Sequence, residues 1–508
     1  MADSAFRRLP FFPILLSALF LVFFSSNGFS QGKQQIEILG ANALKMDTVH
    51  NARKLVGNVK LRQDEVTMEC DSALFYNTSN AVDAFGHVFI YDNLTKVRAD
   101  SLKYDGNNKI AVLTGNVRVI QDSATLETSR LIYNSQLKYA AYYNGGKILS
   151  RDMTVTSRKG YYFTIIKKVH FKGDVEVKSK EYNLLADTMQ YDMEKEISYF
   201  IGPTVITMRN EVIHCESGWY DSKTDISSFG KNTRLQSEAQ KIQTDSLYYN
   251  NNTGLGNCYK YFRWTDTTMN AILIGKRAVF LREQARVTAT DSALLIYLVD
   301  NDSLFLSADT LKSRKDTIAD FTEFFAFHKV KIFKSNLQGV CDSLSFSFKD
   351  STIRMYYEPI LWSEENQLTG DSISMLLVNE KIDRVELYPN GFIINKAHEE
   401  LFNQIKGRHI FGYFKEGSLN KMLVEGNGES IYYGTDDKNA FIGANRAICS
   451  NMWIYMKDAQ VNRIAFLAKP DATFFPIQTI NPSEFRLKGF LWKEEFRPAS
   501  KAALFSKE

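Results

Sequence analysis

Apolar and polar positions recur along this chain with a period of about 29 residues. Written in rows of that length from about residue 51 to about residue 253, the sequence gives seven rows whose apolar columns persist from row to row. A period of this size is the signature of a repeat architecture in which each unit stacks on the next. One apolar column is aromatic throughout and reads Phe75, Tyr104, Tyr133, Tyr162, Tyr191, Tyr220 and Tyr249.

Two further columns are apolar in all seven rows, and they are the candidate functional positions. The first column reads Leu61, Ile90, Val119, Ile148, Val177, Ile206 and Leu235. The second reads Met68, Val97, Leu126, Val155, Leu184, Ile213 and Ile242. A fourth apolar column is headed by Leu55, and a column headed by Cys70 is small throughout, which indicates a place where chain segments approach closely.

The spacing inside each row predicts β-strands. Val97, Ala99 and Ser101 fall on one face of an extended segment, while Arg98 and Asp100 fall on the other. A polar turn follows each aromatic position, and a further short run then leads to a glycine that we expect to turn or bulge the strand. These glycines are Gly57, Gly86, Gly115, Gly173 and Gly202. The pattern therefore predicts about three short strands per row.

Rows with one apolar face cannot bury that face alone, so they must stack on their neighbours. We expect an elongated all-β stack with an apolar interior strip along its length. The period by itself does not decide between an antiparallel β-jelly-roll and a parallel β-solenoid.

The first thirty residues have the pattern of a secretory signal peptide. Arg7 and Arg8 precede an apolar run over residues 11–24, and small residues at 28 and 30 flank a candidate cleavage site. The run is shorter than the roughly 20 residues that a membrane-spanning helix needs. We therefore predict export with cleavage of residues 1–30, with retention as an anchor as the alternative.

Four segments follow from these patterns. Residues 1–30 are the predicted signal peptide and residues 31–253 the regular repeat array. Residues 254–395, where the columns drift, are expected to continue the array in degenerate form. Residues 396–508 are expected to form a small mixed module that caps the stack or binds a partner, because Ala397–Phe402 is compatible with a helix and four of the nine prolines follow it.

Charge and cysteine content narrow the function classes. The chain has 62 Lys and Arg against 58 Asp and Glu, a formal net charge of +4, which is too balanced to indicate a nucleic-acid surface. Cys70 and Cys215 occupy one column five rows apart, and stacked strands about 4.8 Å apart place them beyond disulfide distance. We expect both, and Cys341, to be buried free thiols.

Catalytic and metal-binding motifs are not found. His398-Glu399 begins like a zinc-protease helix, but Phe402 stands where the second histidine ligand would be required. A recurring acidic column repeats in too many rows for a catalytic pair, so we assign it a surface or turn role. Its members are Asp71, Asp100, Asp187, Glu216 and Asp245. The sequence predicts no enzyme activity, no metal and no cofactor.

The repeated motif resembles a known family. A glycine, a polar residue and a valine are followed after about ten residues by a small residue, an acidic residue and a hydroxyl residue. This pattern resembles the OstA/LptA-type repeat of lipopolysaccharide transport proteins. It stands here as Gly57-Asn58-Val59 with Cys70-Asp71-Ser72, as Gly86-His87-Val88 with Ala99-Asp100-Ser101, and as Gly173-Asp174-Val175 with Ala186-Asp187-Thr188.

The resemblance implies an open β-jelly-roll whose apolar interior shields lipid acyl chains in the periplasm during transfer to the outer membrane. It also implies that strand edges join other transport proteins, that an outer-membrane assembly component is a possible partner, and that no catalytic residues exist. On this reading the two candidate columns line a lipid groove. The alternative is an exported structural or adhesive β-stack with a dry core, because a groove lining and a core look identical in sequence.

Overall fold

The computed structural model describes residues 35–92, 95–121, 124–150, 153–281, 286–299, 302–316, 321–457 and 460–505. Residues 1–30, the predicted signal peptide, lie outside this part. The described residues form two compact units, one of residues 35–238 with 244–253 and the other of residues 239–243 with 254–505. No helical segment among them is long and apolar enough to cross a lipid bilayer.

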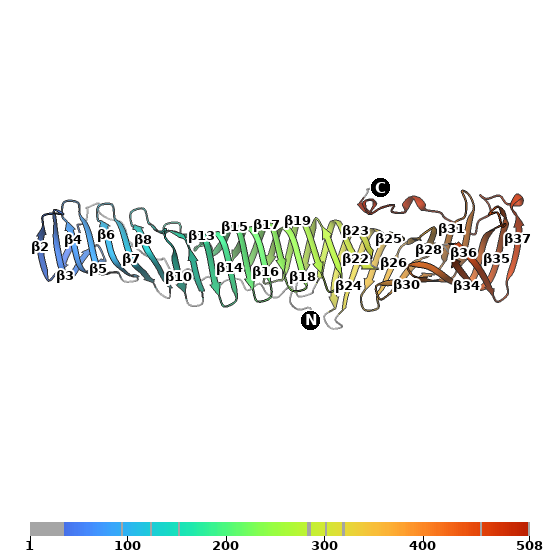
Figure 1. Cartoon of the computed structure of the whole chain (residues 1–508), viewed down its shortest axis with the longest axis horizontal. Coiled ribbons are helices and arrows are strands. Elements are labelled where there is room, and N and C mark those ends of the chain that lie inside the picture. Colours follow the sequence, from blue (N-terminus) through green and yellow to red (C-terminus); the bar gives the residue numbers. More distant parts are fainter. Residues whose placement is uncertain are drawn as a thin grey trace. The chain divides into compact units, whose positions relative to one another are not determined.

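The first unit is built from strands in chain order (Figure 1). They are β1 (Glu37–Gly40), β2 (Ala43–Asp47), β3 (Ala52–Gln63), β4 (Val66–Tyr76), β5 (Ala81–Tyr91), β6 (Thr95–Asp105), β7 (Ile110–Gln121), β8 (Ala124–Asn134), β9 (Tyr139–Tyr142), β10 (Gly146–Ser150), β11 (Met153–Ser157), β12 (Lys159–Phe163), β13 (Lys168–Ser179), β14 (Tyr182–Asp192), β15 (Ile197–Met208), β16 (Val212–Asp221) and β17 (Ile226–Gln236). Strand β18 (Gln240–Asn250) contributes residues to both units.

The second unit continues with strands and short 3-10 turns. They are β19 (Leu255–Asp266), β20 (Ala271–Gly275), β21 (Arg277–Leu281), β22 (Arg286–Val299), β23 (Asp302–Asp316), β24 (Phe321–Lys334), β25 (Leu337–Ser347), β26 (Thr352–Tyr356), β27 (Ile360–Ser363), β28 (Asn366–Thr369), β29 (Ser372–Val378), β30 (Lys381–Tyr388), β31 (Gly391–Lys396), β32 (Phe402–Gly407), β33 (His409–Lys415), β34 (Ser418–Thr435), β35 (Phe441–Lys457), β36 (Gln460–Leu467), β37 (Asp471–Pro476), η2 (Ile477–Thr479), η3 (Glu494–Phe496) and η4 (Ala502–Phe505).

Both units confirm the all-β prediction, and they decide its topology. In the first unit each long strand pairs antiparallel with the next along the chain, from β3 through β8 and again from β13 through β17. The pairings described in the second unit are antiparallel as well. The parallel solenoid is therefore excluded, and the antiparallel jelly-roll is the observed class.

The prediction of three short strands per row is wrong. Most 29-residue rows hold two strands of 10 to 12 residues, such as β5 and β6 or β7 and β8, and the row of residues 138–166 holds four strands of 4 or 5 residues, β9 to β12. The predicted glycines lie at bulges, where the register shifts and Gly57 and Gly115 have φ of +76°. A bulge bends the strand locally, so one continuous strand contributes to two leaves of sheet where the pattern suggested two separate strands.

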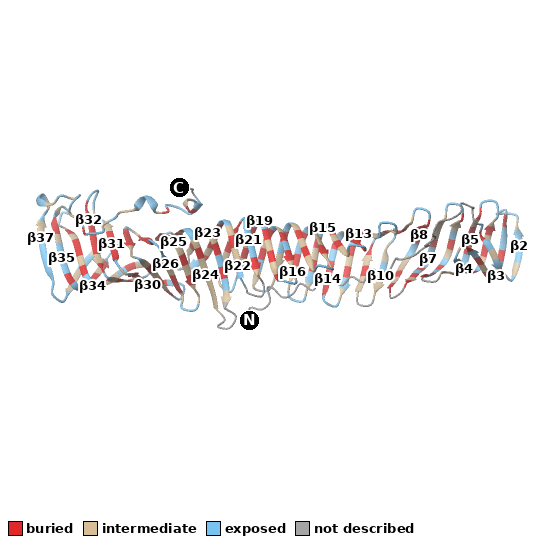
Figure 2. Ribbon diagram, turned by 180° about the vertical axis from the view of Figure 1, so that it is seen from behind, coloured by how far each residue is buried: buried red, intermediate tan, exposed pale blue. Residues whose placement is uncertain are grey.

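The leaves are defined by these bulges. Leaf A comprises the described residues of 59–70, 88–99, 117–128, 146–157, 175–186 and 204–215. Leaf B comprises 72–85, 101–114, 130–142, 160–171, 188–201 and 217–230. Along each strand buried and less buried residues alternate, as Figure 2 shows in red and pale blue, because successive side chains point to opposite faces. The buried face of leaf A and that of leaf B enclose the interior of the unit.

The acidic column and the cysteines have the structural roles expected of them. At the bulges, Asn116 Nδ2 donates to Asp100 Oδ2 at 2.8 Å and His87 Nδ1 lies 2.8 Å from Asp71 Oδ2, both on the exposed surface. All five cysteines are free and buried. Burial raises the pKa of the Cys70 thiol to about 11 and that of Cys215 to about 12.

Gly115 provides a test of the bulge. Alanine at this position is expected to lower the free energy of unfolding by more than about 1 kcal/mol, because it must adopt positive φ and its Cβ would collide with the Asp100 carboxylate. Gly145 is a matched control, since it also has positive φ (+87°) but nothing lies within 4 Å of the position that a Cβ would take. Urea denaturation of Gly115→Ala and Gly145→Ala separates the two causes, and equal losses would contradict the collision.

In the second unit, the C-terminal residues from Ile477 onward lie along strands that are buried on both faces. Gln367 Nε2 donates to the Leu491 carbonyl at 2.7 Å, and Lys493 N donates to Gln367 Oε1 at 2.8 Å. Every residue of β27 is buried, as are most of β28, β31 and β32. The helix considered at Ala397–Phe402 is absent, because residues 397–401 form a bend and Phe402 begins β32 within a hydrophobic cluster.

Candidate functional site

The two predicted columns form one continuous ladder that runs along leaf A and on to Leu235. Antiparallel register places each residue of the first column opposite a residue of the second, beginning with Leu61 opposite Met68 and Met68 opposite Ile90. The ladder then runs through Val97, Val119, Leu126, Ile148, Val155, Val177, Leu184, Ile206, Ile213 and Leu235. Cross-strand neighbours on one face lie about 5 Å apart, so these side chains make an unbroken apolar strip.

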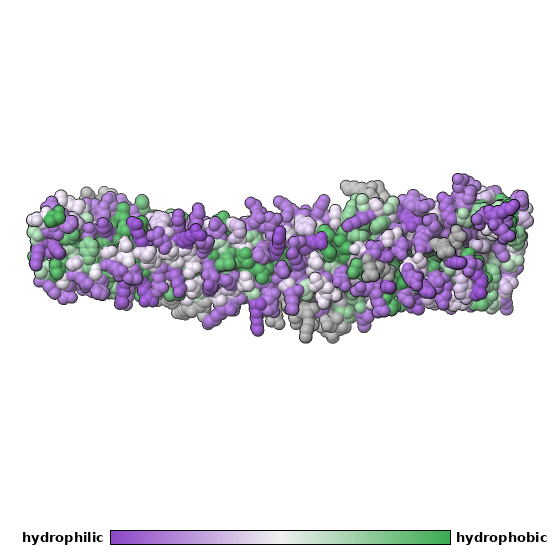
Figure 3. Space-filling view, in the orientation of Figure 1, coloured by the Kyte–Doolittle hydropathy of each residue, from purple (hydrophilic) through white to green (hydrophobic). Residues whose placement is uncertain are grey.

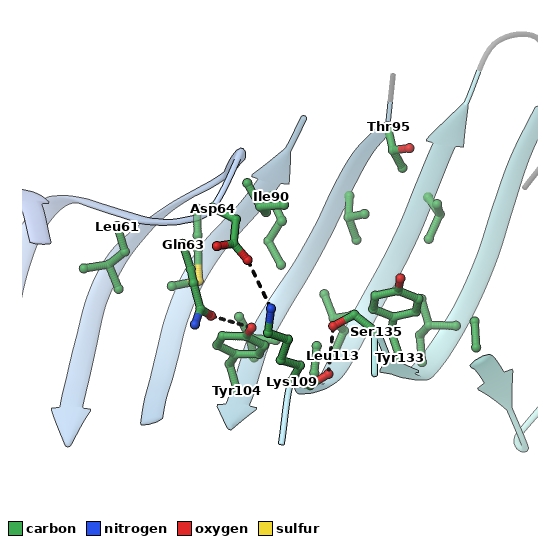
Figure 4. Close-up of a pocket in the computed structure, with 18 of the residues that line it drawn as sticks. Leu61, Gln63, Asp64, Ile90, Thr95, Tyr104, Lys109, Leu113, Tyr133 and Ser135 are labelled. Atoms are coloured by element: carbon green, nitrogen blue, oxygen red, sulfur yellow. Dashed lines mark hydrogen bonds and ion pairs between the residues drawn. The ribbon is translucent and has the colours of Figure 1, made fainter. Parts of the chain in front are cut away.

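A cavity opens beside the first part of this ladder (Figure 4). The space inside it that is open to the centre of a water-sized sphere is about 100 Å³. From leaf A, five predicted residues line it, namely Leu61, Met68, Ile90, Val97 and Val119. From leaf B come Leu102, Leu113 and Leu131 of the column headed by Leu55 and its cross-strand neighbours. The cavity therefore lies between the two leaves.

Tyrosines line the leaf-B side of the cavity nearer its mouth. Tyr104, Tyr133 and Tyr162 alternate along the ladder with Ala111 and Ala140, and all five border the cavity. Burial raises the pKa of Tyr104 and of Tyr162 to about 12. The small alanines leave room between the tyrosine rings, so this tyrosine wall is aromatic and grooved. The raised pKa keeps the tyrosine hydroxyls protonated at neutral pH.

Polar side chains cross the mouth from one leaf to the other. The Tyr104 hydroxyl donates to Gln63 Oε1 at 2.6 Å, and Lys109 Nζ lies 3.2 Å from Asp64 Oδ2 (Figure 4). Thr95, Gln121, Ser135 and Thr164 also border the cavity. An apolar interior with a small set of polar groups at its entrance is the usual composition of a site for a small amphipathic ligand.

The interior is filled in later rows. The column headed by Leu55 changes from Ala84 and Leu113 to Phe171, Phe200 and Phe229, each at most 1% exposed. Tyr191 and Tyr220 are equally buried. In the later rows this column therefore carries large, fully buried aromatic side chains that fill the interior.

Tyr142 stands where the open interior gives way to the filled one. Its ring lies against Gly146 and Gly160, where any Cβ would overlap it, and its hydroxyl is 2.7 Å from Ser157 Oγ. A much smaller space borders this ring and shares Leu131, Ala140 and Tyr162 with the large cavity. Because Gly146 and Gly160 have no side chain, the bulky Tyr142 ring fits into the interior between the open part and the filled part.

The remaining predicted residues are placed as follows. Leu126 and Ile148 border the smaller space beside Tyr142. Five residues lie in the filled rows and are at most 1% exposed, namely Val155, Val177, Leu184, Ile206 and Ile213. Ile242 is 5% exposed, and Leu235 is half-buried. The structure brings five of the fourteen candidates to the large cavity and places most others in the packed interior.

The tyrosine wall and the polar mouth are parts of the site that the repeat pattern did not predict. The tyrosine column was recognised as a repeat feature but was not assigned to the groove. Gln63 and Gln121 end otherwise alternating strands two periods apart, and Lys109, Lys138 and Lys167 share one turn position with positive φ. Polar residues at a fixed phase beside apolar columns are the signal that could have marked the mouth.

Among the residues that the structure describes, no group of three or more His, Cys, Asp or Glu side chains is arranged to hold a metal ion. The prediction that the protein is not an enzyme and uses no cofactor stays a prediction.

Known protein families and solved structures were compared with this chain to find what it is similar to. Residues 33–187 and 183–245 match the family model described as OstA-like protein. The crystal structure of LptH, described as the LptA homologous periplasmic component of the conserved lipopolysaccharide transport device from Pseudomonas aeruginosa, is similar at 18% identity, covering 20% of this chain and 79% of that chain with a TM-score of 0.19. No curated protein matches the chain. The family match confirms the resemblance seen in the repeats, because residues 33–245 of this chain are similar to the OstA-like protein family.

Proposed function

We propose that this protein binds lipid acyl chains in the cavity between leaves A and B and carries lipopolysaccharide or a related lipid across the periplasm to the outer membrane. The observation that carries the proposal is the cavity, which is lined by Leu61, Ile90 and Val119 on one side and by the tyrosine wall on the other. Each buried CH₂ contributes about 0.8 kcal/mol, so a chain of about ten methylenes gains about 8 kcal/mol before ordering costs.

The polar mouth suits an amphipathic ligand. Acyl chains satisfy the apolar wall, while Gln63, Asp64 and Lys109 at the entrance offer hydrogen-bonding and charged groups to a headgroup. The Lys109–Asp64 and Tyr104–Gln63 contacts must open or shift for a lipid to pass between the leaves.

Partner proteins are expected to join through strand edges. Strand β2 pairs with residues 52–56 of β3, the part of β3 that lies next to leaf B, and its Leu44 and Met46 are 60% and 68% exposed. An exposed apolar strand at the beginning of a sheet is a template for pairing with another chain. We propose this edge as a contact for another lipid-transport protein, with an outer-membrane assembly component as a further candidate. Export with cleavage of the signal peptide remains part of the proposal.

The structural or adhesive stack is the second candidate, and the packed rows support it in part. Phe171, Phe200 and Phe229 fill the interior as a dry core requires. The cavity bordered by residues 36–164 is the feature that a purely structural stack does not need, and it favours the lipid-binding function.

Photo-crosslinking tests the proposal. A photoreactive residue at Ile90 or Val119, which line the cavity, is expected to give lipid adducts in cells, detected by mass spectrometry. Two controls sharpen the result, because Val177 is fully buried in the packed rows and Arg118 is exposed on the outer face of β7. Adducts at Arg118 or Val177 equal to those at Ile90, or none at Ile90 and Val119, would overturn the proposal.

A further inference from the structure

The turns beside the cavity mouth carry exposed aliphatic side chains. In the turn of residues 135–138 Leu137 is 70% exposed, and in the turn of residues 164–167 Ile165 and Ile166 are 75% and 53% exposed. Isolated exposed apolar residues are ordinary on a protein surface, but three on two adjacent turns form a cluster of the kind that marks a binding surface. We name these two turns the lysine rim, because each ends in a lysine, Lys138 and Lys167.

The lysine rim is held rigidly. Thr164 N donates to the Lys138 carbonyl at 2.9 Å, so the second turn is stacked on the first, and Met193 N donates to the Lys167 carbonyl at 2.9 Å. Leu137 N donates to Asn134 Oδ1 at 2.8 Å. Both lysines have positive φ, which fixes the shape of each turn. The aliphatic side chains are therefore presented outward by ordered backbone.

The charge of the lysine rim is positive. Lys138 and Lys167 follow Lys109 at the same turn position in successive rows, and two strands per row set them about 10 Å apart. Burial and the neighbouring charge of Lys109 lower the pKa of Lys138. Among the nearby acids, Asp64 faces Lys109 and Asp192 faces Lys168. The next turn, Glu194-Lys195-Glu196, is mainly acidic and ends the basic stretch.

The lysine rim also adjoins the cavity. Ser135 and Thr164, which begin the two turns, border the cavity mouth together with Lys109. On the face drawn in Figure 3 hydrophilic residues predominate, with hydrophobic residues gathered in several patches among them.

We propose that the lysine rim docks on the surface of an anionic lipid bilayer, with Leu137, Ile165 and Ile166 inserted among the acyl chains and Lys138 and Lys167 at the level of the phosphates. Aliphatic side chains flanked by lysines match the apolar interior and negative surface of such a bilayer. Docking in this way sets the cavity mouth against the membrane. This inference goes beyond lipid binding in the cavity and does not depend on it.

A site-specific label tests the docking. Ile166→Cys can be labelled selectively with an environment-sensitive fluorophore, because the five native thiols are buried and the pKa of Cys70, Cys215 and Cys341 is raised to about 11 or 12. Vesicles of phosphatidylglycerol mixed with phosphatidylcholine are expected to shift the emission to shorter wavelength, and spin-labelled lipid is expected to quench it. Val378→Cys is the matched control, since Val378 is 47% exposed at the start of a turn that carries Glu380.

Substitutions of the lysines and of the aliphatic residues complete the test. The fluorophore at position 166 reports binding of the lysine rim to vesicles in the full chain. In the labelled protein, Lys138→Gln with Lys167→Gln is expected to weaken vesicle binding tenfold or more, at about fivefold for each lysine. Ile165→Ser with Leu137→Ser is expected to reduce binding about a hundredfold or more, because each inserted aliphatic side chain contributes about 1.5 kcal/mol or more. Absence of a shift at position 166, an equal shift at position 378, or vesicle binding unchanged by these substitutions would overturn the proposal.

The outcome is separable from that of lipid binding in the cavity. Crosslinks at Ile90 without docking would overturn the membrane contact alone, and docking without crosslinks would overturn lipid transport alone.

Discussion

Replacing Ala111 with phenylalanine is expected to abolish lipid binding in the cavity. Ala111 lies opposite Tyr104 and Tyr133 in the leaf-B ladder and borders the cavity, so a benzyl group in its place projects into the space available to an acyl chain. Phe171, Phe200 and Phe229, which stand in the column headed by Leu55, show that large aromatic side chains can fill the interior of later rows. Lipid retained by the purified protein, measured by mass spectrometry, is expected to fall at least tenfold, because the larger ring excludes several CH₂ groups at about 0.8 kcal/mol each.

Val112→Phe is the matched control, because Val112 is next to Ala111 on β7 and points to the opposite face. This variant is expected to retain lipid at the wild-type level. Unchanged lipid in Ala111→Phe, or an equal loss in Val112→Phe, would count against the cavity as the binding site. A circular dichroism melt of both variants checks that any loss is not a loss of folding.

Truncating Phe200 to alanine is expected to lower the free energy of unfolding by about 3–5 kcal/mol, the usual cost of deleting a buried aromatic ring. Phe200 is 1% exposed and pairs with Met189 and Gly218 across the strands of leaf B. The glycine opposite it has no side chain that could move into the space left behind. Urea denaturation of the purified variant measures the loss.

Tyr199→Ala provides the comparison for Phe200, because Tyr199 is the preceding residue on β15 and is only half-buried on the other face. Its truncation is expected to cost less than about 1.5 kcal/mol, since little apolar surface is lost from the interior. Equal losses in the two variants would show that the filled rows are not a tightly packed core.

The two expected results concern the interior face of leaf B, which borders a cavity in the first rows and is tightly packed in the later rows. In the first rows Leu113 and the alanines between the tyrosines border the cavity, which is the space that the proposed lipid binding would use. In the later rows phenylalanine removes that space and contributes stability instead. A transport role for the whole chain therefore needs a lipid to enter and leave within the cavity bordered by residues 36–164.

Much of the architecture could be predicted because its causes are local and repeated. The alternation around Val97, the glycines at positions such as Gly115 and the small column headed by Cys70 all recur at one phase, and repetition converts weak signals into a strong one. The strand count per row could not be obtained in this way. A bulge and a strand end look alike in sequence, since both are marked by glycine beside polar residues, and only the hydrogen-bond ladder distinguishes them.

The candidate site was predicted in part. The register that joins Leu61, Met68 and Ile90 follows from the period, and these residues do lie on one face. The mouth required contacts over 41 and 45 residues, from Tyr104 to Gln63 and from Lys109 to Asp64, which no periodic column specifies.

The sequence by itself determined that this protein is an all-β repeat with continuous apolar columns, because period and alternation are properties of the chain alone. The tertiary structure decided where those columns enclose a cavity and where they form a packed core. The physical reason is that this difference depends on the volumes of side chains that face each other from leaves A and B. Ala111 between two tyrosines leaves space in its row, whereas Phe200 opposite a glycine fills the interior of a later row.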